Sequence, residues 1–326
     1  MKNTEETILQ VQDLQISFTI DGENIPVVKG LSYTLPKGKV LAVVGESGSG
    51  KTVHALSLLR LLPPTAHICG GKILFRGKDL ASLPAEELRK LRGNKISMIF
   101  QDPSASLNPV LKVGDQLTET ILAHHKISKK KAREMAADLL VKVGISDAEK
   151  RLEDYPFQFS GGMCQRVMIA MALALQPDIL IADEPTTALD VTIQAQILKL
   201  IKTLQKQSGM SALFITHNLA IVAQVADEVL VLYGGLCMER ASAKDLFTSP
   251  LHPYTKGLLA SLVTIEKKPE RLPAISGNPP VPSSQEEKGC PFAPRCAQAM
   301  EKCKTRCPDL FEKKGRWVRC WLEENA

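Results

Sequence analysis

Short apolar runs alternate with helical periodicities along most of the chain. Several runs are apolar throughout, as expected for strands buried on both faces of a parallel sheet: residues 40–44, 96–100, 179–182, 212–215 and 229–232. Apolar residues at three-and-four spacing predict helices over residues 53–62, 130–143, 161–175 and 192–207. This alternation is typical of an open α/β sheet with helices on its faces.

Two segments depart from that alternation. Near the N-terminus, Leu14, Ile16 and Phe18 alternate with polar residues, which predicts a half-exposed antiparallel strand. Residues 103–165 carry helical patterns and no strand pattern. We therefore expect an antiparallel β subdomain and a helical subdomain beside the parallel core.

The composition changes after residue 264. Lys, Glu, Pro and Ser dominate there, which is typical of a linker. Five of the eight cysteines then follow, at or beyond residue 290. We predict one domain over residues 1–264 and a Pro-rich linker with a small Cys-rich module over residues 265–326.

Size and charge narrow the classes of function. The chain of 326 residues is 44% hydrophobic, enough for a substantial core. Its longest apolar run is about nine residues, whereas a membrane-spanning helix needs about 20. Acidic residues near the N-terminus replace the apolar stretch of a secretory signal, so we expect a cytoplasmic location. The net charge of +6 is spread among 35 acidic residues, and we expect no nucleic-acid partner.

A glycine-rich loop follows the apolar run at residues 40–44 and precedes a predicted helix. In such a loop, backbone N–H groups surround phosphates and the helix N-terminus adds positive potential. Lys51 would reach the β and γ phosphates, and the Thr52 hydroxyl would coordinate Mg²⁺. The predicted phosphate-binding residues are Gly45, Glu46, Ser47, Gly48, Ser49, Gly50, Lys51 and Thr52.

Polar residues follow several of the predicted parallel strands. Asp183 and Glu184 end the run at residues 179–182, at the sheet edge where open parallel sheets bind ligands. Asp183 can hold Mg²⁺ through its water shell, and Glu184 can polarise a water for attack on the γ-phosphate. Gln101 and His217 follow two other runs, so we expect them at the same edge.

A second serine- and glycine-rich segment precedes the helix predicted from residue 161. Ser160 is placed to cap this helix, followed by Gly161, Gly162 and, after two residues, Gln165. The serine hydroxyl and glycine amides form another anion-binding surface, which a single phosphate site does not need. We therefore expect another element to supply the other half of this site.

Residues 160–165 resemble the Ser-Gly-Gly-x-x-Gln signature of the ATP-binding-cassette (ABC) family. The resemblance implies a P-loop NTPase (RecA-like) core that hydrolyses ATP, with two subunits joined head to tail. Each signature then closes over ATP held by its partner's phosphate loop. The resemblance further implies roles for the following residues: Gln101 as the glutamine loop and a Mg²⁺ ligand, Asp190 in the loop at the dimer seam, His217 as the switch histidine, and Phe18 against adenine.

Three longer segments, residues 100–109, 185–196 and 252–255, are similar to the peptide and nickel importer subfamily. Met163 and residues 167–172 resemble the first of its two ATPase subunits. The resemblance implies that the protein energises peptide uptake, with nickel or metal-chelate uptake and a non-transport ABC ATPase as alternatives. It also implies a second ATPase subunit, two transmembrane permease subunits, an extracytoplasmic binding protein, and a peripheral position at the cytoplasmic face of the inner membrane.

The C-terminal thiols suggest a metal site, because clustered cysteines of cytosolic proteins are more often metal ligands than disulfides. Structural zinc sites favour close cysteine pairs, whereas gaps of five and six residues separate Cys290, Cys296 and Cys303. Residues 290–296 resemble the tail of peptide-importer ATPases, some of which hold an iron–sulfur cluster. The resemblance implies a [4Fe–4S] cluster on these three thiols and Cys320, with Cys307 as the alternative fourth ligand and Zn²⁺ as the alternative metal.

Overall fold

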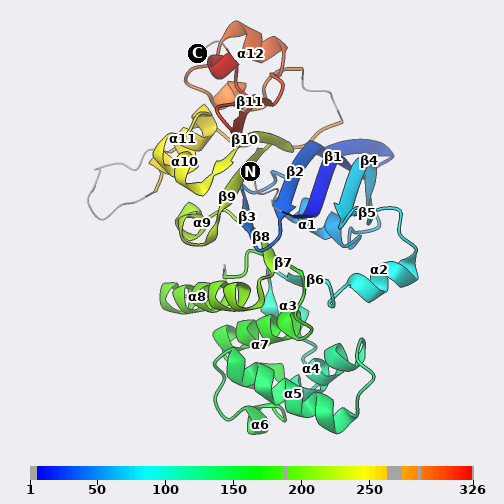
Figure 1. The fold of residues 1–326 in the computed structure, drawn as a ribbon. Coiled ribbons are helices and arrows are strands. Elements are labelled where there is room, and N and C mark those ends of the chain that lie inside the picture. The colour runs from blue at the N-terminus through cyan, green and yellow to red at the C-terminus, as the bar shows by residue number, and fades with distance from the viewer. Residues whose placement is uncertain (1–5, 187–188, 263–273, 285–287, 325–326) are drawn as a thin grey trace. The chain divides into compact units, whose positions relative to one another are not determined.

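The computed structural model describes residues 6–186, 189–262, 274–284 and 288–324 (Figure 1). The chain divides into two compact units. The first unit contains Met1–Ser82 and Phe214–Ala326, and the second contains Leu83–Leu213. No helix in these described ranges is long and apolar enough to cross a membrane.

The first unit contains an antiparallel sheet of the strand order β2-β1-β4-β5. Its strands are β1 (Thr7–Ile20), β2 (Glu23–Pro36), β4 (Ala66–Phe75) and β5 (Lys78–Asp79). In β1, Leu14 and Ile16 are fully buried while Gln15 is exposed. The alternation in the sequence therefore correctly predicted a strand with one face toward the core.

The first unit also contains parallel pairing. The wholly buried β3 (Val40–Val44) pairs in parallel with β9 (Glu228–Tyr233), and β10 (Leu236–Ser242) pairs antiparallel with β9. Helices of this unit are α1 (Lys51–Leu58), α9 (Leu219–Val225), α10 (Ala243–Thr248) and α11 (Pro253–Ala260).

Helix α1 ends earlier than the predicted residue 62. Arg60 has a φ of 50°, in the left-handed region, so the right-handed helix cannot continue through it. Pro63 then disfavours a helical conformation at Leu62. The predicted helix was too long because the three-and-four spacing of leucines continues in the sequence beyond the end of α1.

The second unit pairs β6 (Ile96–Ile99) in parallel with β7 (Ile179–Asp183). Its remaining elements are helical: α2 (Ala85–Leu91), α3 (Pro103–Ser106), α4 (Val113–Leu122), α5 (Lys129–Lys142), α6 (Ala148–Arg151), the 3₁₀ turn η1 (Pro156–Gln158), α7 (Gly161–Leu173) and α8 (Val191–Ser208). Strand β8 (Ser211–Thr216) crosses the boundary between the units. Parallel strands, an antiparallel sheet and a helical stretch over residues 103–165 confirm the predicted α/β fold class.

The cysteine-rich segment is part of the first unit. Strand β12 (Arg316–Val318) pairs with β10, and β11 (Phe311–Lys313) pairs with β12. Three short helical elements complete the segment: η2 (Ala293–Arg295), α12 (Glu301–Thr305) and α13 (Trp321–Glu324). The predicted boundary after residue 264 stays a prediction, because residues 263–273 lie outside the described residues.

Candidate active site

The phosphate loop connects β3 to α1, as its position in the sequence predicted. Gly48 and Gly50 have φ values of 77° and 96°, a region that side chains disfavour. A Cβ on Gly45 would lie 2.2 Å from the Leu232 carbonyl oxygen, so only glycine fits where the loop leaves the sheet. The loop backbone is thereby forced into one curled path.

Lys51 folds back over this loop and is almost fully buried. Its Nζ donates to the carbonyl oxygens of Gly45, at 2.7 Å, and Glu46, at 2.8 Å. These carbonyls satisfy the ammonium group where it would otherwise be costly to bury. The arrangement holds a positive charge at the mouth of the loop, ready for an anionic ligand.

Two residues that the sequence did not assign to the site also hold the loop. The Glu46 N–H donates to the Tyr254 hydroxyl at 3.0 Å. The Glu46 carboxylate pairs with Arg295 of the cysteine-rich segment. Residues 252–255 resembled an importer segment, but no local pattern linked Arg295 to the loop, since 249 positions separate it from Glu46.

In the second unit, Gln101 and Glu184 lie together at the ends of β6 and β7. The Gln101 Nε2 donates to Glu184 Oε2 at 3.2 Å. Glu184 has a φ of 45°, and such left-handed non-glycine residues concentrate at functional sites. Asp183, its neighbour, is buried at the end of the strand. The structure therefore brings the predicted base and the predicted glutamine into contact.

The signature segment begins α7. The Ser160 hydroxyl accepts the N–H of Met163 at 3.3 Å, which confirms the predicted N-cap. Ser160 and Gly161 are exposed. An exposed helix N-terminus with glycine amides can bind an anion. Gln165 is instead buried, and its Nε2 has no hydrogen-bond partner within the described part of the chain.

Asp190 caps the neighbouring helix α8, where its Oδ1 accepts the N–H of Ile193 at 3.0 Å. Ala188, in the same predicted seam loop, lies outside the described residues. The other predicted residues lie in the first unit: Phe18 is half-buried near the end of β1, and His217 is exposed after β8.

Cysteines of the C-terminal segment surround one small cavity. Cys290, Cys296, Cys303 and Cys320 line it together with Phe292. The eight cysteines are free thiols. Burial raises the pKa of Cys290 to about 12 and also raises the pKa of Cys296 and Cys320. Among the described residues, no group of three or more His, Cys, Asp or Glu side chains is arranged to hold a metal ion.

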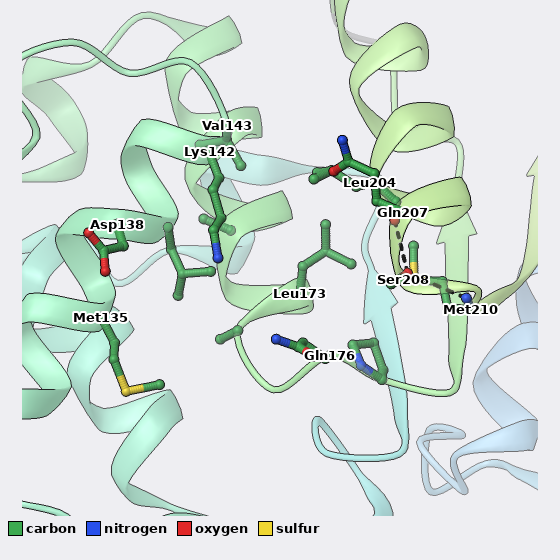
Figure 2. A pocket seen from close by; sticks show the side chains of 14 residues that line it. Met135, Asp138, Lys142, Val143, Leu173, Gln176, Leu204, Gln207, Ser208 and Met210 are labelled. Atoms are coloured by element: carbon green, nitrogen blue, oxygen red, sulfur yellow. Dashed lines mark hydrogen bonds between the residues drawn. The ribbon is translucent and has the colours of Figure 1, made fainter.

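A larger pocket of the second unit lies elsewhere (Figure 2). Its volume is about 290 Å³, and Leu173, Leu204 and Met210 form much of its apolar lining, with Lys142 and Gln176 at its polar side. None of the residues predicted for phosphate or magnesium binding lines it. We therefore base the candidate active site on the strand ends and loops described above.

A lysine-bearing phosphate loop after one parallel strand and acidic residues after another define a P-loop ATPase. Comparison with known families agrees: the family described as "ABC transporter" matches residues 28–187. A second family, described as "Oligopeptide/dipeptide transporter, C-terminal region", matches residues 238–303.

Curated relatives match nearly the whole chain. The dipeptide transport ATP-binding protein DppD of Bacillus subtilis (strain 168) is 51% identical over 321 residues, 98% of this chain and 96% of that protein. The oligopeptide transport ATP-binding protein OppD of Escherichia coli (strain K12) is 46% identical, over 97% of this chain and 93% of that protein.

Solved structures share the fold. The dimeric, post-hydrolysis structure of the ATP-binding cassette MJ0796 bound to ADP and Pi has a TM-score of 0.65 and 25% identity, covering 72% of this chain and 98% of that chain. The chain belongs to the ABC transporter family, and it is an ATPase.

The two signature glycines provide a matched test of the α7 N-terminus. A Cβ on Gly162 would lie 2.9 Å from Ile193 Cγ2, while a Cβ on Gly161 would meet open space. We expect Gly162→Ala to lower the free energy of unfolding by about 1 kcal/mol, since overpacking outweighs the gain in helix propensity. Gly161→Ala should be neutral or slightly stabilising. Urea unfolding of both variants measures the difference, and equal stabilities would contradict the packing described.

Proposed function

We propose that this protein is the ATP-hydrolysing subunit that powers peptide uptake by an ABC importer. The observation that carries the proposal is the extent of the match to DppD of Bacillus subtilis, a dipeptide transport ATP-binding protein. That match includes the C-terminal region, where the family matched is that of oligopeptide and dipeptide transporters. Nickel or a metal chelate is the alternative cargo.

The proposed complex contains a second ATPase subunit, two transmembrane permease subunits and an extracytoplasmic peptide-binding protein. This chain would sit at the cytoplasmic face of the inner membrane, bound to the permeases. The dimer described for MJ0796 supports pairing of two cassettes. The match to DppD covers 96% of that protein, which supports one cassette per chain.

In the proposed ATP site, residues 45–52 bind the phosphates and Phe18 packs against adenine. The curled glycine backbone and the buried Lys51 ammonium support this assignment. Thr52, Asp183 and Gln101 would hold Mg²⁺, which, when bound, neutralises charge on the phosphate oxygens. His217 would contact the γ-phosphate side of the same ATP.

Glu184 is the proposed base that takes a proton from the attacking water. Its position directly after a buried strand, its left-handed backbone and its partial exposure support this role. The hydrogen bond from Gln101 fixes one of its oxygens. Positioning of this kind contributes to in-line attack on phosphorus.

The Ser160–Gly162 surface is proposed to bind the ATP held by the partner subunit's phosphate loop. The exposure of the Ser160 hydroxyl and of the α7 N-terminus supports this, since a buried N-cap could not contact a second chain. Gln165 would support the segment from the interior of the unit, because its side chain is buried. Asp190, at the exposed start of α8, is proposed to lie at the dimer seam.

Glu184→Gln tests the base directly. The amide oxygen can still accept the bond from Gln101, but it cannot take a proton from water at neutral pH. We expect the variant to bind Mg-ATP normally and to hydrolyse it about 100- to 10,000-fold more slowly, the usual contribution of a general base. ATPase assays of the assembled transporter measure this. Glu149→Gln, on the exposed face of α6, is the control. Near-normal turnover of Glu184→Gln would contradict the proposal that Glu184 is the general base.

We further propose a [4Fe–4S] cluster in the cysteine-rich segment, with Cys290, Cys296, Cys303 and Cys320 as ligands. Their arrangement around one cavity supports the proposal, and four thiolates suit this cluster. Cys320 is preferred to Cys307 because Cys320 lines the cavity. Since burial raises the pKa of Cys290 and Cys320, binding of a cluster by their thiolates would release protons.

Anaerobic purification decides between the cluster and zinc. The expected product is brown and carries about four irons per chain. Cys296→Ser should lose the colour and the iron, whereas Cys69→Ser, at an exposed thiol of β4, should retain both. A colourless protein with one zinc per chain would instead establish the rival metal, and a metal-free protein would exclude both.

A further inference from the structure

The second residue of the phosphate loop is fixed by the cysteine-rich segment. Arg295 donates to both carboxylate oxygens of Glu46, from Nη1 at 2.5 Å and from Nη2 at 3.1 Å. The Arg295 side chain is only 6% exposed and that of Glu46 is 24% exposed. A two-pronged pair of this kind restricts both the distance and the orientation of the carboxylate.

The other donors of Arg295 are also used. Nε donates to the Ser276 carbonyl at 2.9 Å, and Nη1 donates to the Tyr233 hydroxyl at 3.1 Å. The guanidinium also lies 5.7 Å from the centre of the Tyr233 ring. These contacts fix the guanidinium plane, so Arg295 acts as a rigid support for Glu46.

The backbone of Glu46 is held from a second direction by Tyr254 on α11. Its hydroxyl accepts the Glu46 N–H, and its side chain is completely buried. The His252 ring accepts the Tyr254 N–H at 3.0 Å and so caps the helix that carries Tyr254. Phe292, two residues after Cys290, packs against the Tyr254 ring with a centroid distance of 5.3 Å.

These restraints reach the proposed phosphate-binding lysine through one shared residue. Glu46 receives Arg295 on its carboxylate and Tyr254 on its N–H, and its carbonyl oxygen accepts from Lys51 Nζ. Displacing Glu46 therefore displaces an acceptor that holds the lysine. The Glu46 carboxylate cannot attract ATP by its charge. A carboxylate next to phosphates would repel them unless a cation neutralised it.

We propose that Arg295 is a positioning residue for ATP binding, through which the cysteine-rich segment controls the shape of the phosphate loop. Arg295 neutralises the Glu46 carboxylate and fixes its orientation, while Tyr254 fixes the Glu46 peptide. The role rests on the proposal that residues 45–52 bind the phosphates. It gives the C-terminal segment a direct part in the ATPase site.

Three variants of the full chain test this, each with Mg-ATP as the titrated ligand. Arg295→Lys keeps the positive charge but loses the two-pronged hydrogen bond to Glu46. Glu46→Gln removes the negative charge that Arg295 pairs with. Tyr254→Phe removes only the hydroxyl that accepts from the Glu46 N–H. We expect Arg295→Lys to raise the Kd about tenfold, within the range usual for coupled sites. Glu46→Gln and Tyr254→Phe should change it in the same direction.

Two further readouts separate positioning from simple stabilisation of the fold. In the assembled transporter, KM for ATP should rise while kcat at saturating ATP is retained, because binding is lost and the chemistry is not. The double variant Arg295→Lys with Glu46→Gln should bind no worse than the weaker single variant, since both act through one contact. Arg316→Lys is the matched control, because Arg316 donates to Ser249 and does not touch the loop.

Lys51→Ala, measured in the same titration, shows which proposal fails. If Lys51→Ala loses binding while the Arg295, Glu46 and Tyr254 variants keep the wild-type Kd, the positioning role is overturned and the phosphate site stands. If Lys51→Ala binds Mg-ATP as well as the wild type, the phosphate site itself is misassigned and the positioning role falls with it. Additive losses in the double variant would also overturn the role.

Discussion

The site depends on a close approach between the phosphate loop and the sheet that carries it. At Gly45 the loop passes so near the Leu232 carbonyl that no side chain fits. That contact turns the chain out of a buried strand and into α1, and it places Lys51 over the carbonyls of Gly45 and Glu46. A positive charge is thereby held in a buried, fixed position, as a pre-organised anion site requires.

Each unit carries some of the residues proposed for the ATP site. The first unit supplies the loop and the lysine, and the second supplies the paired Gln101 and Glu184 together with the exposed Ser160 cap. The exposed Ser160 cap bears on the proposed partner subunit, because a helix N-terminus that faces solvent is available to another chain.

The parts of the fold that the sequence predicted are those that local patterns specify. The all-apolar runs predicted at residues 40–44 and 179–182 lie in the buried strands β3 and β7, and Ser160 caps α7 as its position indicated. Interactions between distant residues were not predictable in this way. No pattern around Arg295 indicates a partner 249 positions away, and the early end of α1 depends on the backbone of Arg60, which its side chain does not reveal.

The central claim is that ATP on one chain meets the signature of the other. ATP carrying a photoreactive group on its γ-phosphate, crosslinked in the complex purified with its partner subunits, tests it most directly. In the wild type, peptide mapping should find label on this chain both at residues 45–52 and at residues 160–165. Lys51→Ala should lose the label at residues 45–52 and keep it at residues 160–165, where the nucleotide is held by the partner's loop. Loss of both labels together would contradict the claim, because it would place both segments around one nucleotide in the same chain.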